Sequence, residues 1–270
     1  MNNLAQRTIT GGVLGLIITV SVSWNAYSFV VLMLAIDLLS LVEFYRLFHN
    51  AGLAPQKKPG LILSTSMLIT CATVMSRLCG PRILLVNIPV AFGIFILELF
   101  RQAKHPVQNL AFTFLGVLSI SIPICFFVGI AFLPVGSGIY HSGVIIGYFL
   151  VLWADDSGAY FIGRAFGSHP LFRRISPGKT WEGSLGGAVC ALLIANLVSR
   201  FVTLPTGADW MIIALIIIFT GTFGDLIKSL MKRSLNLKDS GKILPGHGGM
   251  LDRFDTLLGS APFVFCYLNL

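Results

Sequence analysis

The chain has 270 residues, of which 55% are hydrophobic and only 11% are charged, and its formal net charge is +8 at pH 7. Apolar stretches of about twenty residues recur along it, so this composition excludes an ordinary soluble domain and indicates an α-helical membrane protein. Nucleic acid is not indicated, because the basic residues lie between the apolar stretches, where they would face anionic lipid headgroups or an anionic substrate.

Nine apolar stretches are candidate transmembrane helices, so the predicted fold is all-α and polytopic. Their approximate bounds are 9–24, 27–48, 60–76, 82–100, 110–133, 142–163, 183–203, 209–229 and 255–270. The first and last are short, which suits a tilted or partly buried helix. The first stretch has no convincing small-residue cleavage site, so we interpret it as a retained span and not as a signal peptide.

The positions of lysine and arginine predict a cytoplasmic N-terminus. With nine spans and that orientation, sixteen of the nineteen basic residues lie inside, and only Arg77, Arg82 and Arg200 lie outside. The two long polar loops, 164–182 and 229–254, then both face the cytoplasm. An eight- or ten-span arrangement would place one of these basic loops on the wrong side.

Few polar residues occur in residues 1–110, which we expect to anchor and pack, whereas residues 111–270 form the predicted catalytic region. Glu43 and Glu98 lie one helical turn from Arg46 and Arg101, so structural pairing is favoured for both. Asp37 lies deeper in its span, and the sequence does not explain it. The five cysteines are dispersed without a C-x-x-C, which indicates packing residues and no metal or disulfide framework.

The most highly charged stretch is residues 229–255, S-L-M-K-R-S-L-N-L-K-D-S-G-K-I-L-P-G-H-G-G-M-L-D-R-F-D. Lysines and arginines among glycines suit phosphate oxygens, since backbone N–H groups can approach closely. Neighbouring carboxylates suit a hard divalent ion that bridges phosphates. The alternative is an ordinary basic cytoplasmic loop, which would not need G-H-G-G or three aspartates.

Two further polar motifs precede this stretch. Residues 153–167 read W-A-D-D-S-G-A-Y-F-I-G-R-A-F-G, and residues 176–183 read S-P-G-K-T-W-E-G. Adjacent carboxylates point about 100° apart on a helix, so at most one of Asp155 and Asp156 should aim straight into a shared cavity. A helix-packing face with one aspartate paired to Arg164 is the alternative. A lysine and a hydroxyl at a helix start resemble phosphate-binding sites, although a plain capped turn remains an alternative.

The eighth stretch ends in T-F-G-D-L-I-K-S-L-M-K-R, with Asp225, Lys228 and Lys232 spaced i, i+3 and i+7 on one helix face. An Asp–Lys pair that only neutralises buried charge is the alternative. Asp252 and Asp255 share a face if the last helix has begun there. The three aspartates are therefore predicted to meet at the cytoplasmic mouth and to hold Mg²⁺, and zinc is disfavoured because no His/Cys ligand pattern is present.

The stretch at 229–255, read as S-x-M-K-R-x-x-x-x-K-D-x-G-x-x-L-P-x-H-G-G-M-x-D-R-F-D, resembles the signature of phosphatidate cytidylyltransferases, also called CDP-diacylglycerol synthases. The runs W-x-x-D-x-x-A-Y-x-x-G-R and S-P-x-K-T-x-E-G resemble the same family, in the same order. These motifs cover about residues 150–255, and the N-terminal half matches only as a hydrophobic anchor.

The resemblance implies the reaction of CTP with phosphatidate to give CDP-diacylglycerol and pyrophosphate, for phospholipid biosynthesis. It places metal binding on Asp225, Asp252 and Asp255. It places phosphate or nucleotide contacts on cationic residues of the motifs, namely Lys179, Lys228, Lys232, Arg233, Lys238 and Arg253. Further matching positions, with less defined roles, are Asp156, Ser176, Thr180, Glu182, Asp239 and His247.

Two other functions share these features. An anion transporter would place cations in a central cavity but would need broken helices in both halves. A membrane lipid kinase that uses CTP would share the anionic substrates and the metal. The expected setting is the inner (plasma) membrane, with the site facing the cytoplasm. The sequence leaves open a second, monovalent cation, a homodimer and the role of Asp155.

Overall fold

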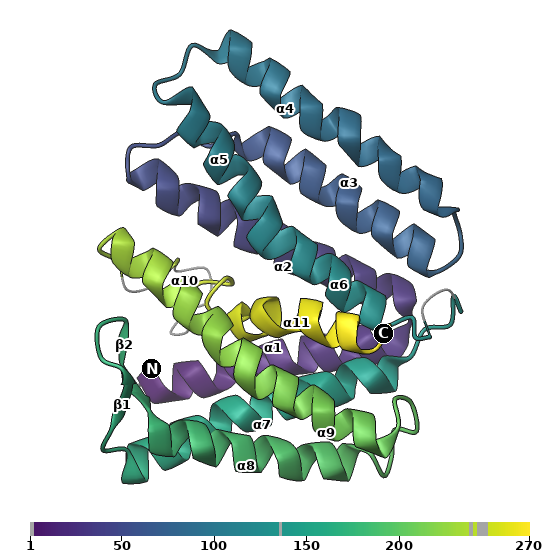
Figure 1. Cartoon of the computed structure of the whole chain (residues 1–270), viewed down its shortest axis with the longest axis vertical. Helices are drawn as coiled ribbons and strands as arrows, with labels where there is room; N and C mark the ends of the chain where they lie inside the picture. The colour runs from purple at the N-terminus through teal and green to yellow at the C-terminus, as the bar shows by residue number, and fades with distance from the viewer. Residues whose placement is uncertain (1–2, 135–136, 238–239, 242–247) are drawn as a thin grey trace. The chain divides into compact units, whose positions relative to one another are not determined.

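A computed structural model describes the chain except residues 1–2, 135–136, 238–239 and 242–247 (Figure 1). The chain divides into two compact units. Unit 1 consists of Met1–Tyr140 and Asp239–Phe254, and unit 2 consists of His141–Lys238 and Asp255–Leu270. The predicted division at residue 110 separates an anchoring region from a catalytic region. It stays a prediction, since the two observed units are defined by packing and not by role.

Unit 1 is helical throughout its described regular structure. Its elements are α1 (Asn3–Trp24), α2 (Ala26–Asn50), α3 (Lys57–Met75), the 3₁₀ helix η1 (Pro81–Val86), α4 (Asn87–Arg101), α5 (Pro106–Gly116), the π-helical turn η2 (Val117–Ser121) and α6 (Ile122–Ile130). Two runs of segments continue without a break, η1 into α4, and α5 through η2 into α6.

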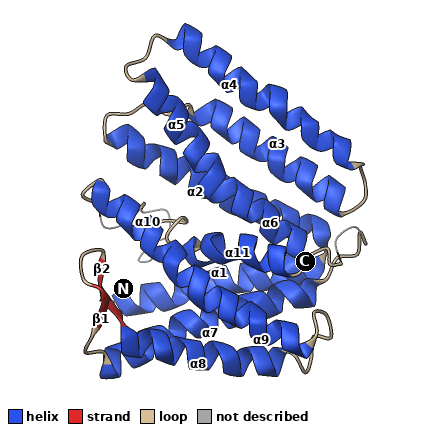
Figure 2. Cartoon of the chain, in the orientation of Figure 1, coloured by secondary structure: helices blue, strands red, loops and turns tan. Residues whose placement is uncertain are grey.

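Unit 2 combines helices with one short hairpin, whose strands are the only ones in the described residues (Figure 2). Its elements are α7 (Ser142–Phe166), β1 (Pro170–Phe172), β2 (Ser176–Thr180), α8 (Trp181–Val198), α9 (Gly207–Ile216), the π-helical turn η3 (Ile217–Gly221), α10 (Thr222–Ser234) and α11 (Asp255–Tyr267). The strands pair antiparallel, with Pro170 opposite Thr180 and Phe172 opposite Ser176. The all-α prediction missed this hairpin.

Each of the nine predicted stretches coincides with a helix or a continuous run of helices. Within the described residues, seven are long and apolar enough to cross a membrane, judged by length and composition alone. They are Ala26–Asn50, Lys57–Met75, Pro81–Arg101, Pro106–Ile130, Ser142–Phe166, Trp181–Val198 and Gly207–Ser234. The first and last predicted stretches fall short of that length, as Ile9–Trp24 in α1 and as the 13-residue α11. The chain is thus a helical protein with several membrane-length helices, and nine spans stay a prediction.

Buried polar groups in unit 1 have hydrogen-bond partners that explain the acidic residues inside its helices. Asp37 is fully buried and accepts hydrogen bonds from Ser64 Oγ of α3 and from Ser121 Oγ of η2, the latter at 2.9 Å. Because an unpaired carboxyl would be costly there, these hydroxyls account for an aspartate that the sequence left unexplained.

Glu98 confirms one of the two predicted acid–base pairs. Its carboxylate accepts hydrogen bonds from Gln56 Nε2 at 2.6 Å and Asn109 Nδ2 at 3.2 Å, and it pairs with Arg101 at 3.3 Å. The other prediction was wrong, because Glu43 and Arg46 form none of the ion pairs found among the described residues. Glu43 instead binds the segment that precedes α11, as shown below.

Glycines let the helices of unit 2 approach closely. A Cβ at Gly158 of α7 would lie 2.8 Å from Cys190 Sγ of α8, and one at Gly163 would lie 3.4 Å from Gly183 Cα. A Cβ at Gly224 of α10 would lie 2.6 Å from Gly259 Cα of α11. Small residues at helix contacts are typical of membrane proteins, where close backbone packing replaces the hydrophobic drive. These contacts bring together the polar ends of α7, α8, α10 and α11.

Candidate active site

The basic face predicted for the eighth stretch is present on α10. Asp225, Lys228 and Lys232 lie on this helix at the predicted spacing. Lys228 and Lys232 are only 7% and 9% exposed, and Asp225 is half-buried. Burying two ammonium groups is costly unless carboxylates compensate them, so acidic partners are required nearby.

Those partners come from α10 and α11. The side-chain carboxyls of Asp225 and Asp255 are hydrogen-bonded to each other, which the close contact of Gly224 with Gly259 permits. Lys228 interacts electrostatically with Asp255, and Lys232 with both carboxyls. Two acidic groups at hydrogen-bonding distance repel each other when both are charged, so this position favours a cation.

One cation is supplied from a distant part of the chain. Lys179, at the end of β2, forms an ion pair with Asp225 of α10. The two side chains are 34% and 19% exposed, so the pair is accessible from solvent. The hairpin that the sequence did not reveal therefore positions a predicted phosphate-binding lysine against the predicted metal-binding aspartate.

A cavity of about 230 Å³ adjoins this pair within unit 2. Its polar lining comes from α7, from the end of β2, from the start of α8 and from the first residues of α10 and α11, and includes Asp155, Asp156, Lys179, Thr180, Thr222 and Thr256. Both neighbouring aspartates line it, Asp155 buried and Asp156 exposed, whereas we expected at most one to aim into it. The packing alternative, with one of them paired to Arg164, is not supported, since Arg164 Nη1 donates a hydrogen bond to the Tyr160 hydroxyl at 3.3 Å. The cavity thus presents carboxylates, hydroxyls and one ammonium group to a ligand.

The 176–183 motif starts α8 as predicted. Thr180 is its N-cap, and Thr180 Oγ1 accepts a hydrogen bond from Gly183 N at 3.1 Å. Glu182 does not line the cavity. It accepts hydrogen bonds from the backbone N–H groups of Ser168 and His169 at 3.1 and 3.2 Å and contacts His169 Nδ1 at 2.5 Å. The motif therefore combines a residue that faces the cavity, Lys179, with one that fixes the loop after α7.

Several predicted binding residues lie outside the cavity lining, namely Ser176, Lys228, Lys232, Arg233 and Arg253. Arg233 is exposed and donates hydrogen bonds to the carbonyl oxygens of Ile175 at 3.4 Å and Leu237 at 3.1 Å. Ser176 lies in β2 opposite Phe172. The predicted residues Lys238, Asp239 and His247 lie outside the described residues.

The described residues 240–241 and 248–254 pack within unit 1, where two carboxylates hold them, Asp252 from the segment itself and Glu43 from α2. Asp252 Oδ2 accepts hydrogen bonds from the N–H groups of Ser240 at 2.8 Å and Gly249 at 3.4 Å. Glu43 Oε2, from α2, accepts from Leu251 N at 2.9 Å and Ser240 Oγ at 3.3 Å. Glu43 is 2% exposed, so this buried carboxylate holds the segment by charge-assisted hydrogen bonds.

The described glycines of this segment serve packing. A Cβ at Gly241 or Gly249 would collide with the Glu43 carboxylate, and Gly248 adopts φ +85°, which other residues rarely tolerate. We expected these glycines to let backbone N–H groups approach phosphate. Their observed neighbours are instead the side chains of Glu43, Ser240 and Asp252.

Asp252 and Asp255 were expected to share a helix face only if the last helix had begun at Asp252, and that condition is not met, because α11 begins at Asp255 and residues 251–253 form a turn. Arg253 is exposed in that turn, with its N–H donating to Met250 O at 3.0 Å. Asp252 belongs to unit 1, whereas Asp225 and Asp255 belong to unit 2. Across the residues that the structure describes, no group of three or more His, Cys, Asp and Glu side chains could hold a metal ion. The observed arrangement is a carboxyl pair, and the three-aspartate site stays a prediction.

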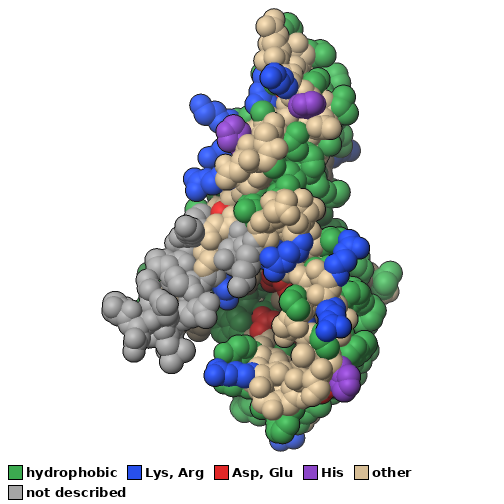
Figure 3. All heavy atoms as spheres, turned by 90° about the vertical axis from the view of Figure 1, so that its left-hand side faces the viewer, with side chains coloured by type: hydrophobic (Ala, Val, Ile, Leu, Met, Phe, Trp, Pro, Cys, Tyr) green, Lys and Arg blue, Asp and Glu red, His purple; other side chains and the backbone are tan. Residues whose placement is uncertain are grey.

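Figure 3 shows acidic side chains set among basic ones in the lower part of its view. This alternation suits a ligand that carries both phosphate groups and a divalent cation.

Sequence reasoning missed the role of Glu43 and left Asp155 without a role. A carboxylate inside a membrane span is the signal that could have found both, since such residues need a partner or a function.

The fold and the polar site define a class: a helical protein with membrane-length helices whose ends carry buried carboxyls, lysines and a polar cavity. Within that class, the chain belongs to the cytidylyltransferase family, since the family model with that description matches residues 5–270.

Curated relatives agree with this family. A protein named phosphatidate cytidylyltransferase from Staphylococcus aureus (strain COL) is 31% identical over 246 residues, 89% of each chain. Proteins of the same name from Haemophilus influenzae and Bacillus subtilis are 44% identical over 130 residues and 46% identical over 122 residues. The first of these two matches covers 46% of this chain and 45% of the relative, and the second covers 45% of each.

Proposed function

We propose that this protein is a CTP:phosphatidate cytidylyltransferase, which converts CTP and phosphatidate to CDP-diacylglycerol and pyrophosphate. The full-length family match and the relatives' names support this reaction class. The observation that carries the proposal is the Asp225–Asp255 carboxyl pair, faced by Lys179 and by the buried Lys228 and Lys232. That arrangement combines sites for a divalent cation and for phosphate oxygens.

The chemistry is a displacement at phosphorus. A phosphate oxygen of phosphatidate forms a bond to the α-phosphorus of CTP, while the bond from that phosphorus to the bridging oxygen breaks and pyrophosphate leaves. Phosphatidate is already anionic at neutral pH, so no strong general base is needed and none is assigned. The main barrier is the approach of two polyanions, which cations can lower by stabilising the charge on the leaving group.

The lysines supply part of that stabilisation. Lys179 can leave Asp225 for a phosphate oxygen when substrate enters, because their pair is accessible to solvent. Lys228 and Lys232 are buried and held by the carboxyls, so they would provide fixed positive charge. Pre-positioned charge costs little reorganisation during the reaction.

The carboxyl pair fits a magnesium ion. Asp225 and Asp255 lie close enough to hydrogen-bond each other, and hard oxygen ligands are those that Mg²⁺ prefers. These two residues would hold it, with Asp252 as a further predicted ligand. When bound, the ion would neutralise phosphate charge and orient the triphosphate. We propose no ligand for a second, monovalent cation.

A membrane setting follows from the lipid substrate. Each buried CH₂ group is worth about 0.8 kcal/mol, so phosphatidate cannot leave the bilayer cheaply. We therefore place the site at the cytoplasmic surface of the plasma membrane, in a chain of nine helices with its N-terminus inside. The homodimer that the sequence leaves open is not needed for this scheme.

Purified full-length protein should be incubated with α-³²P-labelled CTP, phosphatidate vesicles and Mg²⁺, with and without a chelator. The proposal predicts a labelled, cytidylylated lipid and pyrophosphate in equal amounts, and no product with the Asp255→Asn variant. If the lipid instead carries label only when γ-³²P-labelled CTP is supplied, the protein is a lipid kinase. If no lipid product forms, the transporter alternative is favoured and the proposal fails.

A further inference from the structure

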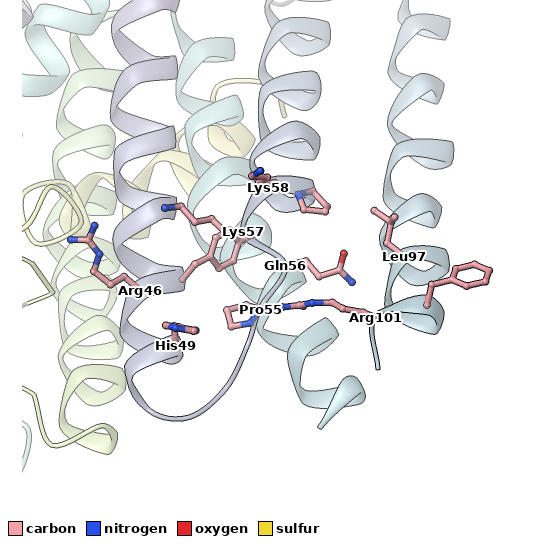
Figure 4. A pocket seen from close by; sticks show the side chains of 11 residues that line it. Arg46, His49, Pro55, Gln56, Lys57, Lys58, Leu97 and Arg101 are labelled. Carbon is pink, nitrogen blue, oxygen red and sulfur yellow. The ribbon is translucent and has the colours of Figure 1, made fainter. Parts of the chain in front are cut away.

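A second pocket, rimmed by basic residues, lies in unit 1, where α2 ends, α3 begins and α4 ends (Figure 4). Its volume is about 640 Å³. In Figure 4, His49 extends from α2, Lys57 and Lys58 stand at the start of α3, and Arg101 points from α4 toward Pro55. None of these residues has a role in the proposed reaction.

The pocket carries a positive charge that its lining does not neutralise. Its permanently charged lining residues are Arg46, Lys57, Lys58 and Arg101. No Asp or Glu from the described part of the chain lines it. The carboxylate of Glu98 pairs with Arg101, but it is buried and also occupied by Gln56 and Asn109. Lys57 and Lys58 are exposed, so a phosphate group would find accessible ammonium groups here.

One wall of the pocket is apolar. Leu97 and Phe100 of α4 line it and are 52% and 80% exposed. In a chain of membrane-length helices, such exposed side chains face lipid. The pocket therefore joins a cationic end to a surface that suits hydrocarbon.

The face of α3 that begins with Lys58 continues as an apolar groove. Lys58, Ile62, Thr65 and Ile69 are spaced i, i+4, i+7 and i+11, which places them on one helix face. A groove of about 480 Å³ is lined by Leu38 of α2 and by residues of this face, including Ile62, Thr65 and Ile69. From Lys58 to Ile69 the helix rises about 16 Å, close to half of a hydrocarbon core about 30 Å thick.

We propose that unit 1 binds an anionic phospholipid, with its phosphate among Lys57, Lys58 and Arg101 and an acyl chain along the groove of α3. Charge complementarity selects the headgroup, and the groove selects an amphiphile over free phosphate. The site shares no residue with the proposed active site, since Asp225, Asp255 and Lys179 belong to unit 2. It therefore binds lipid whether or not the proposed reaction is correct.

The first test is binding. Full-length protein in detergent is titrated with phosphatidylglycerol and phosphatidylcholine, and bound lipid is counted by native mass spectrometry. We expect retention of phosphatidylglycerol over phosphatidylcholine, and a Lys58→Gln variant that binds it about fivefold more weakly, the value of one lysine at an anionic lipid surface. Lys104→Gln is the matched control, since Lys104 is an exposed lysine close to the end of α4 and does not line the pocket. Equal weakening by both variants would show a general basic surface and overturn the proposal.

The second test locates the lipid in the unchanged protein. Phosphatidylglycerol with a photoreactive diazirine in one acyl chain should label peptides of α2 and α3, whose residues line the groove, and inorganic phosphate at the same concentration should not compete. Labelling confined to unit 2, or full competition by inorganic phosphate, would refute the site.

Discussion

The carboxylate of Glu43 should decide whether the segment before α11 is ordered. In a Glu43→Leu variant, Leu251 N–H and Ser240 Oγ lose their shared acceptor, at 2.9 and 3.3 Å. A buried donor left without a partner costs about 1–3 kcal/mol of stability. The longer hydrogen bond, from Ser240 Oγ, is expected to cost an amount near the lower end of that range. We therefore expect the variant to favour local opening of residues 248–254 by about 2–4 kcal/mol.

Hydrogen exchange measures this opening directly. A cost of about 2.8 kcal/mol corresponds to a hundredfold faster exchange at Leu251. Glu43→Gln keeps an acceptor oxygen and should stay within about tenfold of the unmodified protein, because only the charge assistance is lost.

Glu98→Leu is the control, since Glu98 is also buried in unit 1 but binds Gln56, Asn109 and Arg101. It should loosen residues near Gln56 without changing exchange at Leu251. Unchanged exchange at Leu251 in Glu43→Leu, or an equal increase in both variants, would refute the role given to Glu43.

Three further predictions concern activity and packing. Asp252→Asn should lower turnover more than a hundredfold while the protein still inserts, because the Asn oxygen can still accept from Ser240 N; near-normal turnover in a membrane-fraction assay would reject Asp252 as a ligand. Lys179→Gln should reduce kcat/KM about a hundredfold and Lys179→Arg less, measured with saturating phosphatidate, and equal values for both would exclude a charge effect. Gly158→Leu should lower thermal stability by about 1–3 kcal/mol, whereas Gly93→Leu, which faces open space, should not, as a melting curve of each would show.

The helices could be predicted from sequence because hydropathy is a local property. All nine stretches matched helices or helix runs, and the spacing of Asp225, Lys228 and Lys232 correctly placed them on one face. The β-hairpin escaped detection because strands of three and five residues are too short for an alternating pattern.

Long-range contacts could not be predicted. Nothing in the sequence near Glu43 reveals that its partners lie about two hundred residues away. The sequence therefore favoured an ion pair with Arg46, one helical turn away. The predicted last stretch began at residue 255, as α11 does, so Asp252 could have shared a helix face with Asp255 only if the helix had started a turn earlier. Motif positions thus indicated chemistry, whereas tertiary contacts determined which residues share a site.

The membership of residues 239–254 in unit 1 has a consequence for dissecting the protein. A gene fragment that ends after Tyr140 would encode every helix of unit 1 but would lack the backbone and hydroxyl donors that solvate Glu43. In such a fragment the carboxylate of Glu43 would be buried without these hydrogen-bond donors. The two units should therefore be co-expressed as overlapping pieces or kept on one polypeptide.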